Sequence, residues 1–216
     1  MASARTETRN SAEFPSISNY LFAHTDKFSE NRYCLFPEEN AFTVVAYLPE
    51  PLRSWLMELR RTLPLAVTSE PHLTVLPPRP LSLPIEEVAD KLSAILDGWA
   101  SFAVELSSVR VFSGSNVLFL EVSQGSRTLE LLHTHLNRDE FVHEEDFPFH
   151  PHVTIGAITA CHSVEEIKRM AQVAWNNSHC PTRFPVTELA LALRGRGEWT
   201  RLREYRLWSA AHAAQT

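Results

Sequence analysis

The sequence contains no apolar run that approaches the ~18 consecutive residues needed to cross a membrane. Its first residues, MASARTETRN, are polar and no apolar stretch follows them, so we expect no secretory signal. Cysteine is also scarce. The three cysteines, Cys34, Cys161 and Cys180, are scattered and lack the C-x-x-C spacing of a zinc knuckle. This favours reduced thiols in a cytoplasmic protein over a disulfide scaffold.

Positive charge is in deficit as well. The 216 residues carry a net charge of −6 at pH 7, which argues against a general nucleic-acid coating protein, although a local basic patch could still bind phosphates. A composition of 44% hydrophobic and 21% charged residues is typical of a globular protein. The length allows one substantial domain or two small lobes. We expect no cofactor, no membrane association and no obligate protein partner.

Residues 1–40 lack sustained periodicity, and we expect an irregular N-terminal arm before a single domain at 41–216. From residue 41 the patterns of strands and helices alternate. The first half predicts a strand at AFTVVAYL (41–48), a helix opened by Pro51, a strand at PHLTVLPP (71–78), a helix after Pro84 and a strand at SFAVELSSVRVF (101–112). We expect Pro77 and Pro78 to end the second of these strands.

The second half predicts the same order of elements. Its segments are a strand at NVLFLEV (116–122), a helix at 126–139, a strand at HPHVTIGAI (150–158), a helix at 163–177 opened by a capping box from Ser163 to Glu166, and a strand at FPVTELALAL (184–193). A hairpin then adds a last strand at 198–209. The repeated order predicts an α+β fold made of two β-α-β-α-β units, with lobes at about 41–114 and 115–208 whose strands could be permuted.

Two short motifs occupy equivalent places in the two halves, HLTV at 72–75 and HVTI at 152–155. Each places a histidine and a threonine two residues apart, on the same face of a strand. His72 is thus matched by His152, and Thr74 by Thr154, whereas His150 has no counterpart because position 70 is a glutamate. If the halves pack as pseudo-twofold lobes, two imidazoles and two hydroxyls converge across a central cleft.

Such a set of side chains suits a phosphate diester. A neutral imidazole can take a proton from an attacking water or hydroxyl, while a protonated imidazole gives one to the leaving oxygen. Histidine can hold either role because its unperturbed pKa is about 6.5. The threonine hydroxyls can donate hydrogen bonds to the non-bridging oxygens, where charge accumulates in the transition state. This chemistry needs no metal.

The two H-x-T-x motifs, HLTV and HVTI, resemble those of the two-histidine (2H) phosphoesterase superfamily, and in particular its 2′-5′ RNA ligase and RNA 2′,3′-cyclic phosphodiesterase branch. The resemblance in element order covers about residues 41–208. It implies a bilobal α+β fold with antiparallel sheets that flank a central cleft and helices outside. It also implies a metal-independent site that opens 2′,3′-cyclic phosphates of RNA ends or small nucleotides, or joins RNA ends through a 2′-5′ linkage.

Carried over by position, the resemblance makes His72 and His152 the catalytic acid and base, and makes Thr74 and Thr154 the phosphate-binding residues. Which histidine has which role stays open. The superfamily also includes members that act on cyclic ADP-ribose phosphates or 2′-5′ oligoadenylates, and members that mainly bind nucleotides. The motifs do not separate these substrates.

Two other functions remain open at this point. A nucleotide-binding or RNA-binding module could keep the same fold and pocket without turnover, although four intact motif residues favour an enzyme. A metal-dependent hydrolase could use the H-x-H pair of His150 and His152, although no third ligand repeats at metal spacing.

Further contacts to the substrate are expected from residues near the motifs. Arg79 follows the first motif in a predicted loop, and Phe149 or Phe147 could stack a base beside the second. His150 is expected at the edge of the site. The C-terminal hairpin contains arginines that either meet RNA phosphates or pair with nearby glutamates, namely Arg194, Arg196, Arg201, Arg203 and Arg206.

Overall fold

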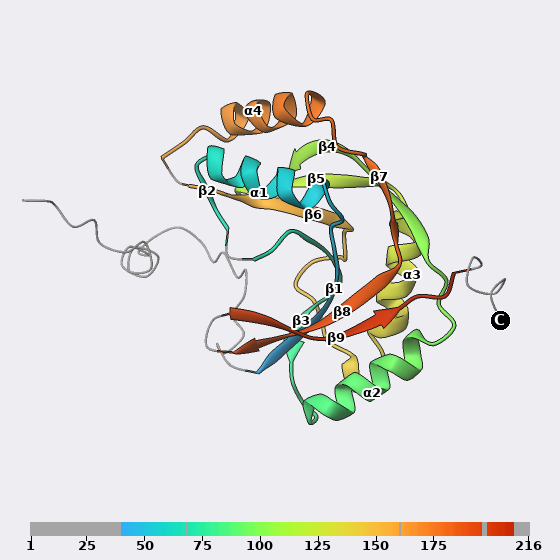
Figure 1. Cartoon of the computed structure of the whole chain (residues 1–216). Coiled ribbons are helices and arrows are strands. Elements are labelled where there is room, and N and C mark those ends of the chain that lie inside the picture. Colours follow the sequence, from blue (N-terminus) through green and yellow to red (C-terminus); the bar gives the residue numbers. More distant parts are fainter. Residues whose placement is uncertain (1–39, 68, 160, 196–197, 210–216) are drawn as a thin grey trace, which may run out of the picture. The chain divides into compact units, whose positions relative to one another are not determined.

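The computed structural model describes residues 40–67, 69–159, 161–195 and 198–209 (Figure 1). The expected arm at 1–40 lies outside the described residues except for Asn40, and so does Cys34. The strands are β1 (Ala41–Tyr47), β2 (Leu65–Ala66), β3 (His72–Pro80), β4 (Phe102–Val111), β5 (Val117–Gln124), β6 (His152–Ile158), β7 (Arg183–Val186), β8 (Glu188–Gly195) and β9 (Glu198–Arg206). The helices are α1 (Leu52–Thr62), α2 (Ile85–Leu96), α3 (Ser126–Leu136) and α4 (Val164–Asn176), with a 3₁₀ turn at Asp139–Phe141.

All the strands join one nine-stranded sheet in the order β7-β4-β5-β6-β3-β1-β8-β9, with β2 paired to β6. Every ladder in it is antiparallel, which confirms the α+β fold with antiparallel strands that we predicted. The two motif strands, β3 and β6, are neighbours at the middle of this order. The order also places β4 beside β5 and β7, and β8 beside β1, so strands of the two sequence halves are interleaved in the sheet. The division into lobes at about 41–114 and 115–208 stays a prediction.

Two strand predictions were wrong in their boundaries. β3 does not end at the prolines but continues to Pro80, and it pairs with β1 on both sides of a register shift at Pro77 and Pro78. Its other edge meets β6 at Leu73↔Val153 alone among the described pairs, so the missing N–H groups of Pro77 and Pro78 interrupt no ladder there. The segment FPVTELALAL is two strands: β7 pairs with β4, and β8 pairs with β1.

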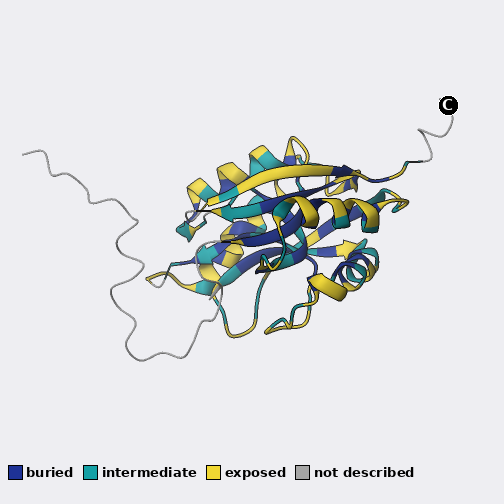
Figure 2. Cartoon of the chain, turned by 90° about the horizontal axis from the view of Figure 1, so that it is seen from below, coloured by how far each residue is buried: buried dark blue, intermediate teal, exposed yellow. Residues whose placement is uncertain are grey.

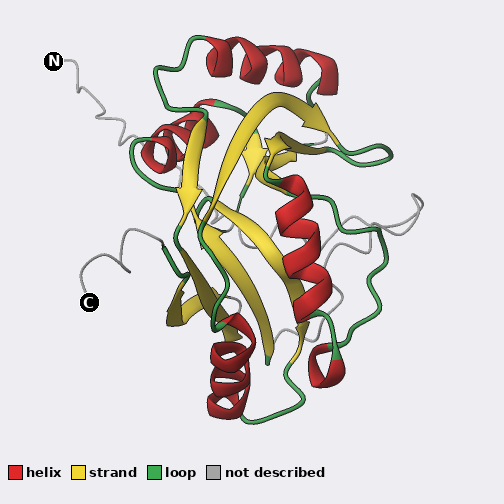
Figure 3. Ribbon diagram, turned by 90° about the vertical axis from the view of Figure 1, so that its right-hand side faces the viewer, coloured by secondary structure: helices red, strands yellow, loops and turns green. Residues whose placement is uncertain are grey.

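The helices lie against the sheet (Figures 1 and 3), and nearly all of their buried residues are apolar. α1 and α4 meet through the rings of Trp55 and Trp175, whose centroids are 5.3 Å apart. α2 is tied to β9 by the hydroxyl of Tyr205, which donates a hydrogen bond of 3.0 Å to the carbonyl of Ala89. The predicted cap of α4 is present, because the Ser163 hydroxyl accepts from the N–H of Glu166.

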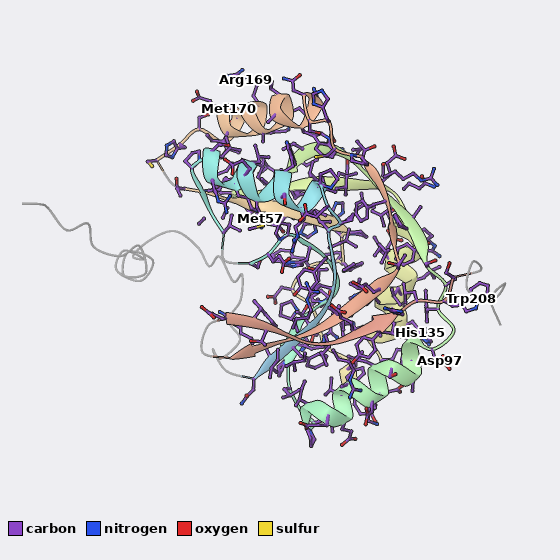
Figure 4. The ribbon with its side chains drawn as sticks, viewed as in Figure 1. Met57, Asp97, His135, Arg169, Met170 and Trp208 are labelled. Carbon is purple, nitrogen blue, oxygen red and sulfur yellow. The ribbon has the colours of Figure 1, made fainter. Side chains whose placement is uncertain are left out.

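The core lies between these helices and the sheet, where buried residues follow the strands (Figure 2). The outward faces of the helices carry exposed side chains instead, such as Met57 of α1 and Met170 of α4 (Figure 4). Cys161 and Cys180 are free thiols. Within the described ranges, no helix is long and apolar enough to span a membrane.

Candidate active site

The motif side chains share one face of the β3–β6 pair. Leu73 and Val153 are register partners, and both are fully buried on the core face. Because side chains alternate along a strand, the histidine and threonine on either side of each apolar partner point to the opposite face. In an antiparallel pair, this register turns His72 towards Thr154, and Thr74 towards His152. All four are partly exposed, so the structure brings the predicted residues together on an accessible surface.

Both imidazoles are held by the same backbone contact. Nδ1 of His72 lies 2.7 Å from the carbonyl oxygen of Glu70, and Nδ1 of His152 lies 2.6 Å from that of His150. A carbonyl can only accept, so Nδ1 carries the hydrogen in each ring. In the neutral form, Nε2 of each histidine is therefore the unprotonated nitrogen. Nε2 of His152 also lies 3.2 Å from the Thr154 hydroxyl, which donates to it.

Burial keeps both imidazoles neutral near pH 7. Burial lowers the pKa of His152 from 6.5 to about 4, with a smaller contribution in the same direction from positive charge on His150 or His72 and an opposing one from the His150 carbonyl. Burial also lowers the pKa of His72, with the nearby positive charge of Arg60 acting in the same direction and the carbonyl and carboxylate of Glu70 opposing it. Each ring can therefore accept a proton at Nε2 in the unliganded protein.

Aromatic rings form a wall on the His152 side of the site. Phe112 and Phe119 stack on each other with centroids 4.1 Å apart, and both meet the His152 ring edge to face, at 4.8 and 5.4 Å. Phe112 is partly exposed, whereas Phe119 is buried. Neither was predicted from the sequence, because only the pairing of β4, β5 and β6 brings them beside the motif.

The His72 side is more polar. The ring of Tyr47 in β1 lies edge to face with His72 at 6.3 Å, and the guanidinium of Arg201 lies 3.8 Å above the Tyr47 ring. Arg201 also pairs with Glu204 at 2.6 Å, and Arg203 pairs with Asp90 at 2.7 Å. Part of the predicted arginine patch is therefore paired with carboxylates. Arg196 lies outside the described residues.

The expectation of a substrate contact from Arg79 was wrong in its premise, because Arg79 is in β3 and is 2% exposed. Its guanidinium donates to the side chain of Asn137 at 2.7 Å and forms an ion pair with Glu145 at 3.1 Å. It also donates to the carbonyls of Pro77 and Phe141. A guanidinium with these partners has a structural role and is not available to a ligand.

The side chains of Phe149 and His150 both pack against other rings. The Phe149 ring stacks on His133 with centroids 4.0 Å apart and packs against the core, so its face is already covered. Phe147 is 61% exposed. His150 is exposed, its carbonyl accepts from Nδ1 of His152, and its ring meets Phe112 and Phe119 edge to face with centroids 5.6 Å apart.

The H-x-H pair does not come with further metal ligands. The rings of His150 and His152 are 6.3 Å apart, and the described part of the chain holds no group of three or more His, Cys, Asp or Glu side chains placed to bind a metal. A zinc site in proteins takes at least three such ligands.

A family model for the 2′-5′ RNA ligase superfamily matches residues 48–198, which is most of the chain, and the chain therefore belongs to this superfamily. This confirms at the level of the family the resemblance that the two motifs predicted. A comparison with curated proteins gives no match.

Solved structures extend the likeness to the fold. E. coli LigT in its apo form has 21% sequence identity and a TM-score of 0.56, and E. coli LigT complexed with phosphate has 21% identity and a TM-score of 0.54. Kluyveromyces marxianus Usb1 has 12% identity and a TM-score of 0.53. Each match covers 79% of this chain and 99% of the other. At these identities the likeness concerns the fold alone.

Proposed function

We propose that this protein is a metal-independent phosphodiesterase that hydrolyses the 2′,3′-cyclic phosphate of RNA ends or small nucleotides, and that it can run the reverse 2′-5′ ligation. One histidine of the pair His72 and His152 acts as general base and the other as general acid. Thr74 and Thr154 donate hydrogen bonds to the non-bridging phosphate oxygens. Membership of the superfamily supports phosphodiester chemistry, and the site geometry supports these residues for it.

The observation that carries the proposal is the matched presentation of the two imidazoles. Each ring donates from Nδ1 to the carbonyl two residues earlier in the chain, just before its strand begins, which leaves Nε2 as the reactive nitrogen on the partly exposed face. A single histidine on a strand with only a structural role does not need its Nε2 kept free in this way. Two of them on neighbouring strands, each accompanied by a threonine, provide one proton acceptor and one proton donor on either side of a phosphorus atom.

The reaction is balanced with water as the nucleophile. The base takes a proton from water as its oxygen bonds to phosphorus, and the bond from phosphorus to one ribose oxygen breaks. The acid gives its proton to that oxygen, which leaves a phosphomonoester on the other. Both rings are neutral in the free protein near pH 7, so the acid acquires its proton when the anionic phosphate binds and raises the pKa of the imidazole beside it.

The aromatic wall supports a nucleotide as the substrate. The partly exposed ring of Phe112 stands next to His152, and base–aromatic stacking is a common way to hold an unpaired nucleobase. We expect the base to lie on this side of the site. Phe112→Leu, which keeps an apolar side chain but removes the ring, should raise KM for a cyclic nucleotide more than it lowers kcat.

The test is incubation with the four nucleoside 2′,3′-cyclic phosphates, comparing the parent protein with His72→Ala, His152→Ala and the exposed control His179→Ala. We expect turnover by the parent and the control, and a loss of about 10²- to 10⁴-fold in each motif variant. The parent should show a bell-shaped dependence of rate on pH. Near-full activity in either motif variant would contradict the two-histidine mechanism.

Two alternatives give different outcomes in the same assay. A nucleotide-binding or RNA-binding module would show no turnover of any cyclic phosphate together with tight binding of a nucleotide by calorimetry. A metal-dependent hydrolase using His150 and His152 would lose its activity in excess chelator and regain it with zinc. We expect activity to survive the chelator.

A further inference from the structure

Both motif strands contain a β-bulge immediately after the threonine. Between β1 and β3, Val44 pairs with Leu76 and Val45 pairs with Thr74, so Val75 has no partner opposite it. Between β5 and β6, Leu118 pairs with Gly156 and Phe119 pairs with Thr154, so Ile155 is skipped in the same way. A bulge leaves its extra residue outside the ladder and redirects the side chains beside it.

Each bulge carbonyl is bound by a side chain from a helix. The carbonyl of Ile155 accepts from Nε of Arg60 in α1 at 3.0 Å, and the carbonyl of Val75 accepts from Nδ1 of His133 in α3 at 3.1 Å. Helix α1 follows the first strand of the first half, and α3 follows the first strand of the second half. The exchange is reciprocal, because each helix supports the motif strand of the other half.

The Arg60 guanidinium makes further contacts that join the two motifs. Its Nη2 donates to the carbonyl of Thr154 at 2.7 Å, and its Nη1 donates to the carbonyl of Ser69 at 2.8 Å. Ser69 lies three residues before His72 in the segment that leads into β3. One planar group thus spans the backbone of both motif segments. Among the described residues, no carboxylate lies within ion-pair distance of Arg60, so its charge is balanced only by carbonyl dipoles.

We propose that Arg60 and His133 are the positioning residues of this site, each holding one bulge so that the histidine and threonine before it are aimed at the same phosphate. The inference rests on the proposed function and deepens it. In this role neither residue needs to touch the substrate. Arg60 acts through the backbone of Thr154 and the approach to His72, and His133 acts through the backbone one residue beyond Thr74.

The first experiment replaces Arg60 by methionine or lysine and uses Arg61→Met as a matched control, since Arg61 is the next residue of α1 and pairs at the surface with Glu58. We expect Arg60→Met to lower kcat on a cyclic nucleotide by about 100-fold with little change in KM, because misplaced catalytic groups cost rate more than binding. Arg60→Lys keeps the charge but not the planar fork, and should recover only part of the rate. Arg61→Met should match the parent.

A second readout tests the electrostatic link between Arg60 and His72 and needs no turnover. The charged or titratable groups that face His72 are Arg60, the Glu70 carboxylate, Tyr47 and His152. Removing the positive charge of Arg60 should raise the pKa of His72, followed by NMR titration of its ring, while Arg61→Met leaves the titration unchanged. An unchanged His72 titration in folded Arg60→Met, together with parent-like kcat, would overturn the proposal for Arg60.

His133 is tested by a pair of variants. The side-chain amide of His133→Asn can donate from about the position of Nδ1, whereas His133→Leu cannot, so we expect Asn to retain most of the rate and Leu to lose it. Equal rates for the two would overturn the role of His133. If Arg60→Met fails to fold, this pair still tests whether a helix side chain positions a motif through its bulge. If the parent protein turns over no cyclic phosphate, the proposed function fails, but the His72 titration still tests the electrostatic link between Arg60 and His72.

Discussion

The burial of His152 predicts a specific dependence of stability on pH. Its pKa is about 4 in the folded protein and 6.5 when exposed, as in the unfolded chain. When the pH falls below about 6.5, His152 becomes protonated in the unfolded chain but stays neutral in the folded protein. The folded state therefore loses stability until the pH reaches about 4. At about 1.36 kcal/mol for each pKa unit, the loss amounts to at most about 2 kcal/mol between about pH 7.5 and about pH 5.

The assay is urea unfolding followed by tryptophan fluorescence at several pH values, for the parent protein and His152→Gln. Other titrating groups contribute nearly equally to both proteins, so the difference between their free energies of unfolding isolates His152. We expect the free energy of unfolding of the parent, minus that of His152→Gln, to fall by about 2 kcal/mol on going from about pH 7.5 to about pH 5. The exposed control His179→Gln should run parallel to the parent. A constant difference between the parent and His152→Gln would show that the imidazole is not desolvated, and the argument for a neutral ring near pH 7 would fail.

Three further substitutions test separate parts of the structure. Thr154→Val should lower kcat on a cyclic phosphate by about 10- to 100-fold, because it removes a hydrogen-bond donor to a charged oxygen. Thr154→Ser keeps the hydroxyl and should retain most of the rate. Equal rates for the two variants would show that the hydroxyl takes no part in the mechanism. In urea unfolding, Gly156→Ala should cost about 1–3 kcal/mol, because a Cβ there would stand 2.7 Å from a valine side chain, whereas Gly195→Ala, with no atom within 4 Å, should be nearly neutral. Arg79→Met should cost about 3 kcal/mol in the same assay by leaving the largely buried Glu145 carboxylate without its cation, and a change below about 0.5 kcal/mol would contradict the structural role assigned to Arg79.

The sequence sufficed to predict the two motifs and the fold class because both depend on local patterns. Alternation along a strand decides that His72 and Thr74 share a face, and the repeat supplies the matching pair in the second half. The helices were predictable from apolar positions at helical spacing, as with the buried leucines of α1. None of these inferences needs to know which strands are neighbours.

The remaining features of the site depend on neighbours that local patterns do not determine. Phe112 reaches His152 because it stacks on Phe119 of β5, which pairs with β6 beside the motif. Arg79 was expected in a loop because two prolines normally end a strand, yet beyond Leu73 one edge of β3 is unpaired and tolerates them. Arg60 and Ile155 are 95 positions apart, and nothing in the helical pattern around Arg60 indicates which carbonyl its guanidinium meets.

The bulges explain why the duplication is visible in the motifs and not in the residues that support them. In the proposed mechanism both copies of the motif present an imidazole and a hydroxyl, so the same residue types recur in both. The bulge that follows has a weaker requirement, a hydrogen-bond donor for one buried carbonyl, which a guanidinium or an imidazole can meet equally well. Arg60 fulfils it for one half and His133 for the other. Supporting residues in a duplicated site are therefore better found by asking which side chain donates to each bulge carbonyl than by searching for the same residue type in both halves.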